Sequence, residues 1–258
     1  MMELMNIVHG RSALRPIQLA ACAVVLLAVT NVAYADEPLT KVDAAVNRWK
    51  TLDFSYKIVT TQPGAKPSTL KLRMRMRKKG GNNQQMVEIS EPADMDGTKI
   101  LTASPTKMYI YMPSFGKVRR IASHVTEQGF LGTALSQRDM TLTHYSTYYD
   151  STTTADDSAS VTLTLTAKPD KNAPYPKIVL TASKSNWMPT ELRYFSDKGV
   201  HIKTETRKKY LCSQGYCCPT VQTLVDHTSK LETTLYLKKH KINPRIPGKV
   251  LAKRYLLR

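Results

Sequence analysis

Alternation of apolar and polar side chains is the strongest pattern in the chain. Between residues 70 and 77, Leu70, Leu72, Met74 and Met76 alternate with four basic residues. Successive side chains of a strand point to opposite faces of a sheet, so this run predicts a strand with one apolar face and one basic face. The pattern is typical of an ordinary half-buried strand. It also fits the wall of an apolar cavity, since methionine adapts to irregular partners.

Similar short runs recur along the chain and predict a mainly β fold. They lie at residues 54–58, 85–89, 99–103, 107–112, 117–121, 161–167, 177–182, 189–196, 201–210, 220–225 and 230–237. Turn residues separate them at intervals of about 8–12 residues, as in antiparallel sheets. We expect a meander in a single domain, residues 36–258, arranged as a sandwich, a barrel or a curved open sheet.

Four segments depart from this pattern. Apolar residues at helical spacing predict a helix over residues 40–50, capped by Thr40. Residues 130–140 form an irregular apolar segment, and the Ser, Thr and Asp content of residues 145–157 predicts a surface loop. Residues 249–257 are expected to form a short closing helix.

The N-terminus has the features of a signal peptide over residues 1–35. Arg11 and Arg15 precede an apolar run at residues 19–32, and Ala33-Tyr34-Ala35 is a small-x-small cleavage site. We expect cleavage after Ala35 and export, with an uncleaved anchor as the alternative. A box resembling a lipoprotein cleavage site ends at Cys22, but the apolar run follows this cysteine, so we interpret the box as coincidence.

The chain is strongly basic, with a formal net charge of +18. Such a balance attracts polyanions, including nucleic acid, an anionic membrane surface and acidic lipid headgroups. Export argues against nucleic acid as a partner. Part of the excess charge is also explained by a well-solvated surface.

Three cysteines follow the leader, in a C-x4-CC arrangement. The simplest hypothesis is one disulfide from Cys212 to either Cys217 or Cys218, with one thiol left over. No histidine nearby completes a familiar zinc-ligand spacing, so we expect no metal site. The sequence also lacks the G-x-S-x-G, H-E-x-x-H, P-loop and dinucleotide-binding motifs, so we expect neither an enzyme nor a cofactor.

Several motifs resemble the outer-membrane lipoprotein-sorting protein family, a LolA-like branch of periplasmic proteins. The motifs are Met108-Tyr109-Ile110-Tyr111-Met112-Pro113, Lys117-Val118-Arg119-Arg120-Ile121 and Leu131-Gly132-Thr133-Ala134-Leu135-Ser136, with further similarity at residues 139–140, 174–180, 188–189, 243–247 and 252–256. The chain has Ala134-Leu135 where the family has Asp-Phe, and Gln137-Arg138 where it has Tyr-Glu. Two acidic positions are therefore lost, and with them any partner contact made through those acids.

The resemblance implies a LolA/LolB-like incomplete antiparallel β-barrel with helices plugging its concave face. Its apolar hollow would hold the acyl chains of a lipoprotein or phospholipid. The implied function is that of a non-enzymatic periplasmic carrier working towards the outer membrane. Its implied partners are an inner-membrane exporter of the resistance–nodulation–division type and an outer-membrane acceptor. The alternative is a periplasmic sensor or interaction module that uses the same fold to regulate a membrane partner.

These considerations give three sets of candidate residues. The expected lining of the hollow is Leu72, Met74, Met76, Met108, Ile110, Met112, Leu131 and Leu135. The expected rim, which would face a phosphate or the acids of a partner, is Lys117, Arg119 and Arg120. Neighbouring residues of a strand face opposite ways, so at most one of Arg119 and Arg120 points into the hollow. Pro113, Gly116 and Gly132 are expected in turns.

Overall fold

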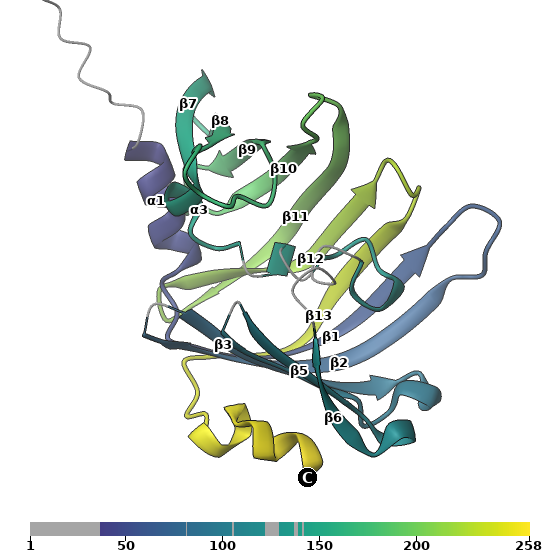
Figure 1. The fold of residues 1–258 in the computed structure, drawn as a ribbon. Coiled ribbons are helices and arrows are strands. Elements are labelled where there is room, and N and C mark those ends of the chain that lie inside the picture. The colour runs from purple at the N-terminus through teal and green to yellow at the C-terminus, as the bar shows by residue number, and fades with distance from the viewer. Residues whose placement is uncertain (1–36, 81, 105, 122–128, 137–138, 141) are drawn as a thin grey trace, which may run out of the picture. The chain divides into compact units, whose positions relative to one another are not determined.

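Thirteen strands form one sheet within the described part of the chain (Figure 1). The fold comes from a computed structural model, which describes residues 37–80, 82–104, 106–121, 129–136, 139–140 and 142–258. The strands are β1 (Thr51–Thr61), β2 (Ser68–Lys79), β3 (Asn82–Glu91), β4 (Lys99–Ser104), β5 (Lys107–Met112), β6 (Lys117–Ile121), β7 (Tyr149–Asp156), β8 (Ser160–Ala167), β9 (Lys177–Ser183), β10 (Pro189–Phe195), β11 (His201–Ser213), β12 (Tyr216–Asp226) and β13 (Glu232–Ile242).

The sheet consists of two antiparallel meanders joined through their first and last strands. The spatial order is β6-β5-β4-β3-β2-β1-β13-β12-β11-β10-β9-β8-β7, and β1 pairs with β13. Every ladder between these strands is antiparallel. No ladder among the described residues joins β6 to β7, so the sheet remains open at these two edges. The predicted incomplete antiparallel barrel is confirmed.

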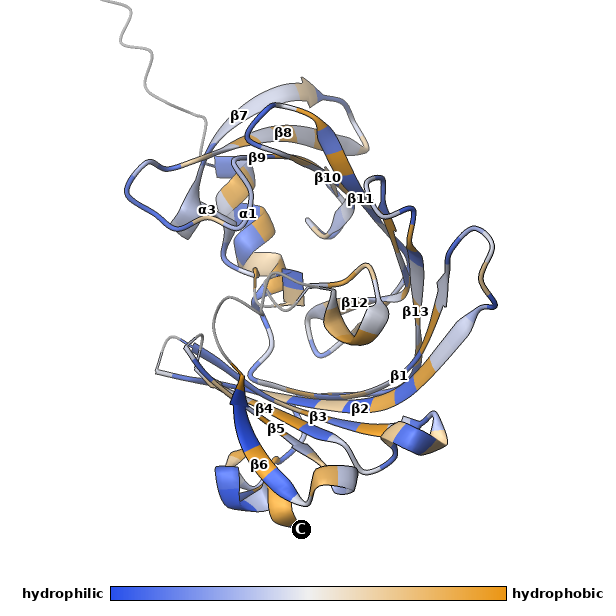
Figure 2. Ribbon diagram, turned by 45° about the vertical axis from the view of Figure 1, so that its right-hand side comes forward, coloured by the Kyte–Doolittle hydropathy of each residue, from blue (hydrophilic) through white to orange (hydrophobic). Residues whose placement is uncertain are grey.

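The sheet curves around two helices, α1 (Glu37–Val46) and α3 (Tyr145–Tyr148), which lie on its concave side (Figure 2). Leu39 and Val42 of α1 are fully buried in one apolar cluster that also contains Leu163 of β8 and Leu180 of β9. Burial of such side chains is the main force that holds a short helix on a sheet. The carboxylate of Asp43 accepts hydrogen bonds from the backbone N–H groups of Tyr145 and Ser146, at 2.8 and 2.9 Å, and so joins the two helices.

The outer face of β3, β4 and β5 is covered by the end of the chain. Two 3-10 helices, η6 (Gly248–Leu251) and η7 (Lys253–Leu257), replace the predicted closing helix. Leu251 and Leu256 pack with Met86 and Leu101 in a separate apolar cluster. The described helices include none that is long and apolar enough to span a membrane.

This cover buries part of the basic face of β2, which an ordinary half-buried strand would leave in water. Arg75 is only 8% exposed, because η7 lies over it. Its guanidinium forms an ion pair with Glu88, donates a hydrogen bond to the hydroxyl of Tyr255 at 3.3 Å, and lies 5.4 Å from the centre of the Tyr255 ring. Arg75 is therefore a structural residue.

Two further predictions of secondary structure are wrong. The first helix begins at Glu37 and ends at Val46, so Thr40 lies inside it and does not cap it. Residues 145–157 contain α3 and strand β7 instead of a loop. The polar sequence of β7 suits a strand at the edge of the sheet, where most side chains face water on both sides.

We predict that the C-terminal cover contributes to stability through Leu256. This side chain is fully buried, so Leu256→Ala should lower the free energy of unfolding by about 2–5 kcal/mol. Its neighbour Leu257 is 64% exposed, so Leu257→Ala should change the free energy of unfolding by less than about 0.5 kcal/mol. Urea denaturation of both variants measures the difference. Equal effects of the two substitutions would show that η7 does not cover the sheet.

Candidate functional site

The concave side of the sheet contains an apolar cavity of about 160 Å³, here called the hollow. Its walls come from β1, β2, β3, β11, β12, β13 and the end of α1. Described residues between β6 and α3 also contribute. The lining residues are Val46, Trp49, Leu52, Phe54, Tyr56, Ile58, Leu72, Met74, Met76, Val87, Phe130, Leu135, Asp139, Met140, Leu142, Thr143, Met188, Arg207, Tyr216, Cys218, Pro219, Gln222 and Leu235.

The alternation of β1 and β2 builds the floor of the hollow. The register places Phe54 opposite Met74 and Tyr56 opposite Leu72. Because side chains two residues apart share a face, these four point together towards the concave side. Hydrophobic and hydrophilic residues alternate along both strands (Figure 2). The local sequence pattern therefore determines which side of this part of the sheet is apolar.

The described residues 129–136, 139–140 and 142, here called the plug segment, fill much of the space on the concave side. Phe130, Leu135 and Leu142 are buried and line the hollow. The backbone N–H of Phe130 donates to the carbonyl of Leu135 at 2.6 Å. The backbone N–H of Ala134 donates to the hydroxyl of Thr233 on β13 at 2.9 Å. The plug segment is thus hydrogen-bonded to the sheet that it covers.

A buried ion pair also connects the plug segment to the sheet. The Nζ atom of Lys203 on β11 lies 2.8 Å from Oδ2 of Asp139, and the two side chains are 8% and 1% exposed. The hydroxyl of Tyr175 donates to Oδ1 of Asp139 at 2.6 Å and lies 3.0 Å from the same Nζ atom. The carboxylate and the ammonium are therefore both paired and hydrogen-bonded, as buried charges must be.

A second buried charge pair follows on the same face of β11. Arg207 forms an ion pair with Glu205, and that carboxylate also accepts hydrogen bonds from Tyr194 at 2.6 Å and Gln222 at 2.9 Å. Burial, followed by the charge of Glu205, raises the pKa of Tyr194 well above its ordinary value, so this phenol remains a donor. Arg207, Gln222 and Asp139 line the hollow and give it one polar side.

Sequence reasoning did not identify the charged residues of β11 as part of a site. The signal was present, since Lys203, Glu205 and Arg207 alternate with Thr204 and Thr206 and so share one face of a strand. The partner carboxylate of Lys203 is remote in sequence, at Asp139, and no local pattern indicates that contact.

The structure brings together part of the predicted lining. Leu72, Met74, Met76 and Leu135 line the hollow, whereas Met108, Ile110, Met112 and Leu131 do not. Ile110 and Leu131 pack against the neighbouring apolar cluster, and Met108 is only 4% exposed within β5. Met112 lies half-buried at the end of β5. A role in ligand binding stays a prediction for all eight.

The predicted rim residues Lys117, Arg119 and Arg120 are exposed on β6, at the open edge of the sheet. The guanidinium of Arg119 lies 4.9 Å from the centre of the Phe115 ring, and Arg120 donates to the carbonyl of Thr106 at 3.0 Å. Contact of these residues with a partner stays a prediction.

The three predicted turn residues lie in tight backbone turns. Pro113 begins a 3-10 helix, η3 (Pro113–Phe115), and Gly116 caps its C-terminal end. Gly116 and Gly132 have φ values of +60° and +76°, in the left-handed region that glycine adopts without strain.

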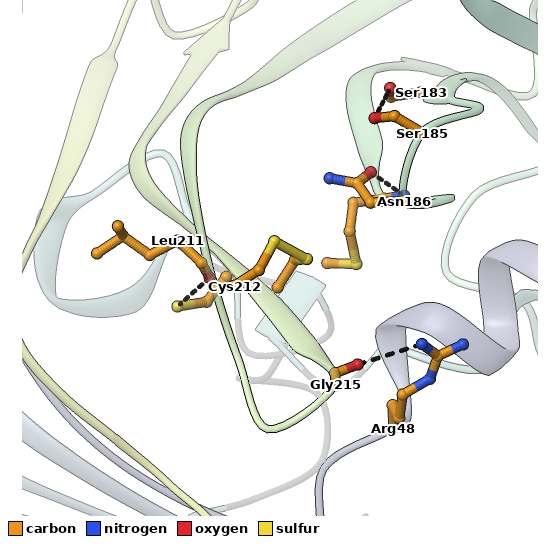
Figure 3. The surroundings of a disulfide bond; sticks show 10 residues. Arg48, Ser183, Ser185, Asn186, Leu211, Cys212 and Gly215 are labelled. Carbon is orange, nitrogen blue, oxygen red and sulfur yellow. Dashed lines mark hydrogen bonds between the residues drawn. A yellow bond between two sulfur atoms is a disulfide. The ribbon is translucent and has the colours of Figure 1, made fainter.

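The cysteines lie where β11 and β12 pair (Figure 3), and Cys218 lines the hollow. Cys212 and Cys217 form a disulfide. Cys218 keeps a buried thiol whose Sγ lies 3.6 Å from the carbonyl oxygen of Leu211. The turn that follows Cys212 contacts the residues just after α1, because Arg48 donates to the carbonyl of Gly215 at 3.2 Å.

The comparisons with known proteins agree with this fold. Residues 81–258 match a family model described only as an uncharacterized protein. No curated protein matches the sequence. Among solved structures, an outer-membrane lipoprotein-sorting protein domain from Vibrio parahaemolyticus superimposes with a TM-score of 0.77 at 20% identity, covering 87% of this chain and 98% of that chain.

Two other solved structures have the same architecture. A DUF1329 family protein from Desulfovibrio piger has a TM-score of 0.76 at 16% identity, covering 86% of this chain and 98% of that chain. A LolA superfamily protein from Nitrosomonas europaea has a TM-score of 0.68 at 22% identity, with the same coverage of 86% and 98%. These similarities establish a LolA-like fold.

We predict strong coupling between Lys203 and Asp139. Lys203→Met leaves a buried carboxylate without its cation and should lower the free energy of unfolding by about 3–5 kcal/mol. Adding Asp139→Asn removes that charge. The loss of unfolding free energy in the double variant should therefore be smaller than the sum of the two single losses, by at least about 1 kcal/mol. Chemical denaturation of all four proteins measures the coupling. Additive losses would mean that the pair does not exist in solution.

We predict that the Cys218 thiol is unreactive in the folded protein. Burial raises its pKa to about 11, so at pH 8 almost all of it is protonated, whereas an exposed thiol has a pKa of about 8.5. Alkylation at pH 8 without reductant should therefore become about a hundredfold faster in urea, with Cys218→Ala giving the background. Similar rates with and without urea would show that the thiol is exposed.

Proposed function

We propose that this chain, which belongs to the family described as an uncharacterized protein and has the fold of the LolA-like lipoprotein-sorting proteins, carries acyl chains of a lipoprotein or phospholipid. The observation that carries the proposal is the apolar hollow on the concave face of an open sheet. Burying an acyl chain there removes hydrocarbon from water, at about 0.8 kcal/mol per CH₂ group. Such binding needs an apolar surface and no directed chemistry.

Acyl-chain binding requires the hollow to widen. A cavity of about 160 Å³ is close in size to one that holds a benzene molecule. Space for a long chain becomes available when Phe130, Leu135 and Leu142 of the plug segment move away from the floor. Flexible Met74 and Met76 on that floor suit ligands of varied shape.

The charges of the hollow support a binding role rather than catalysis. Among the described residues that surround it, Asp139 pairs with Lys203 and Glu205 pairs with Arg207. These pairs are satisfied within the protein and hold the plug segment and the polar side in place. The function we propose is therefore non-enzymatic.

The proposed setting is the periplasm, after removal of residues 1–35 by cleavage following Ala35. The positive, apolar and small-residue regions of the N-terminus support export. In this setting the exposed residues Lys117, Arg119 and Arg120 on the open edge strand are available to a partner. The proposed donor is an inner-membrane exporter of the resistance–nodulation–division type, and the proposed recipient is an acceptor at the outer membrane.

We predict that a charge on the floor of the hollow abolishes acyl-chain binding. Met74→Lys places an ammonium where hydrocarbon is to be buried, so the affinity for a fluorescent long-chain fatty acid should fall by about tenfold or more. Val200→Lys places the same charge at a 57% exposed position outside the hollow and should leave the affinity nearly unchanged. Fluorescence titration measures both, and circular dichroism confirms that both fold.

The milder variant Met74→Gln keeps the test usable if the lysine variant unfolds. Failure of the unmodified protein to bind any acyl probe would refute the carrier function. Equal losses in the Met74 and Val200 variants would place binding elsewhere on the chain.

A further inference from the structure

The outer face of β13, β1 and β2 carries rows of cations that the structure leaves uncovered. The register aligns Tyr236, Lys57 and Lys71 in one row across the three strands. It aligns Lys239, Ser55 and Arg73 in the next. These side chains alternate with those that face the hollow, so they point to the opposite side of the sheet.

The charge of this surface is only partly neutralised. Lys71 pairs with Glu91 at 2.6 Å, and Arg73 pairs with Asp53 at 2.7 Å. Both pairs lie at the surface, where such contacts are weak. No carboxylate of the described residues forms an ion pair with Lys57 or Lys239. The surface therefore has a net positive potential.

A groove of about 520 Å³ runs between these side chains. Its lining combines the polar and charged residues Ser55, Lys57, Lys71, Arg73, Glu88, Ser90, Lys238 and Lys239 with Tyr56, Leu72 and Ile89. The carboxylate of Glu88 is paired with Arg75, so it does not neutralise the lysines. Arginine and lysine side chains around a shallow groove form a suitable site for a phosphate group.

We propose that this outer patch, defined as Lys57, Lys71, Arg73, Tyr236 and Lys239, docks the protein on an anionic lipid surface. Each lysine or arginine near such a surface adds to the attraction, and lipid headgroups rearrange to meet cations that are spread over several strands. Tyr236 is 37% exposed among the cations. A tyrosine in this position suits the membrane interface, where its ring contacts the apolar region and its hydroxyl contacts water.

Charge and an exposed aromatic residue together favour a membrane over an acidic protein. A protein partner would need a complementary surface of fixed shape. The outer patch is instead a broad sheet face with one shallow groove. The inference builds on the proposed function, since a carrier of acyl chains must approach the membranes that donate and receive them.

Co-sedimentation with vesicles tests the docking surface. The full chain is mixed with vesicles of phosphatidylcholine alone, or of phosphatidylcholine and phosphatidylglycerol in equal parts. We expect binding to the anionic vesicles only, and we expect high salt to abolish it, because exposed charges are screened. Lys57→Glu with Lys239→Glu should weaken binding by about tenfold or more.

The matched control is Lys107→Glu with Lys198→Glu, two exposed lysines outside the outer patch that give the same change of net charge; Lys107 begins β5 and Lys198 lies in the turn between β10 and β11. It should keep most of the binding. Equal weakening in both variants would overturn the proposal, because net charge alone would then explain the effect. If the variant with Lys57→Glu and Lys239→Glu fails to fold, Lys57→Gln with Lys239→Gln removes the same two positive charges without adding negative ones.

Two further outcomes also decide the proposal. Absence of binding to anionic vesicles, with binding to polyglutamate instead, would overturn it in favour of an acidic protein. Uptake of a fluorescent fatty acid, measured on the same variants, separates this inference from the carrier function. A protein that takes up the fatty acid but ignores vesicles refutes only the docking surface, and one that binds vesicles but no fatty acid refutes only the carrier.

Discussion

The pairing of β1 with β13 is the contact on which the rest of the structure depends. These two strands come from near opposite ends of the described chain, and their pairing joins the two meanders. The register runs from Leu52 opposite Ile242 to Thr61 opposite Glu232. The concave face is continuous only because these strands meet. The same ladder brings Thr233 to the plug segment, whose backbone it binds. Floor and cover of the hollow are therefore positioned by one interaction between remote strands.

Buried charge is the second feature that shapes the hollow. Removing ions from water is costly, and the ion pairs of Lys203 and Glu205 recover that cost only while their geometry is kept. An apolar cavity alone would accept many arrangements of the segment that covers it. A plug held by Asp139 has one preferred position, so these charges favour a specific arrangement over an adaptable one.

Much of the fold could be predicted from the sequence, because most strands show period-two alternation and their turns contain glycine and proline. Strand β7 was missed because an edge strand needs no apolar face. The burial of Arg75 was missed because it depends on η7, which comes from a distant part of the chain. For the same reason, only part of the predicted lining faces the hollow. Alternation shows which residues share a face, whereas long-range packing decides what covers that face.

The central claim is that the hollow holds acyl chains, and native mass spectrometry tests it most directly. Protein comprising residues 36–258 would be purified from the periplasm without detergent, and the bound lipid would be extracted and identified. The account predicts a protein mass increased by one or more acyl-bearing molecules, which organic solvent releases. A protein that carries no lipid, and that takes up neither added phospholipid nor triacylated peptide, would contradict it.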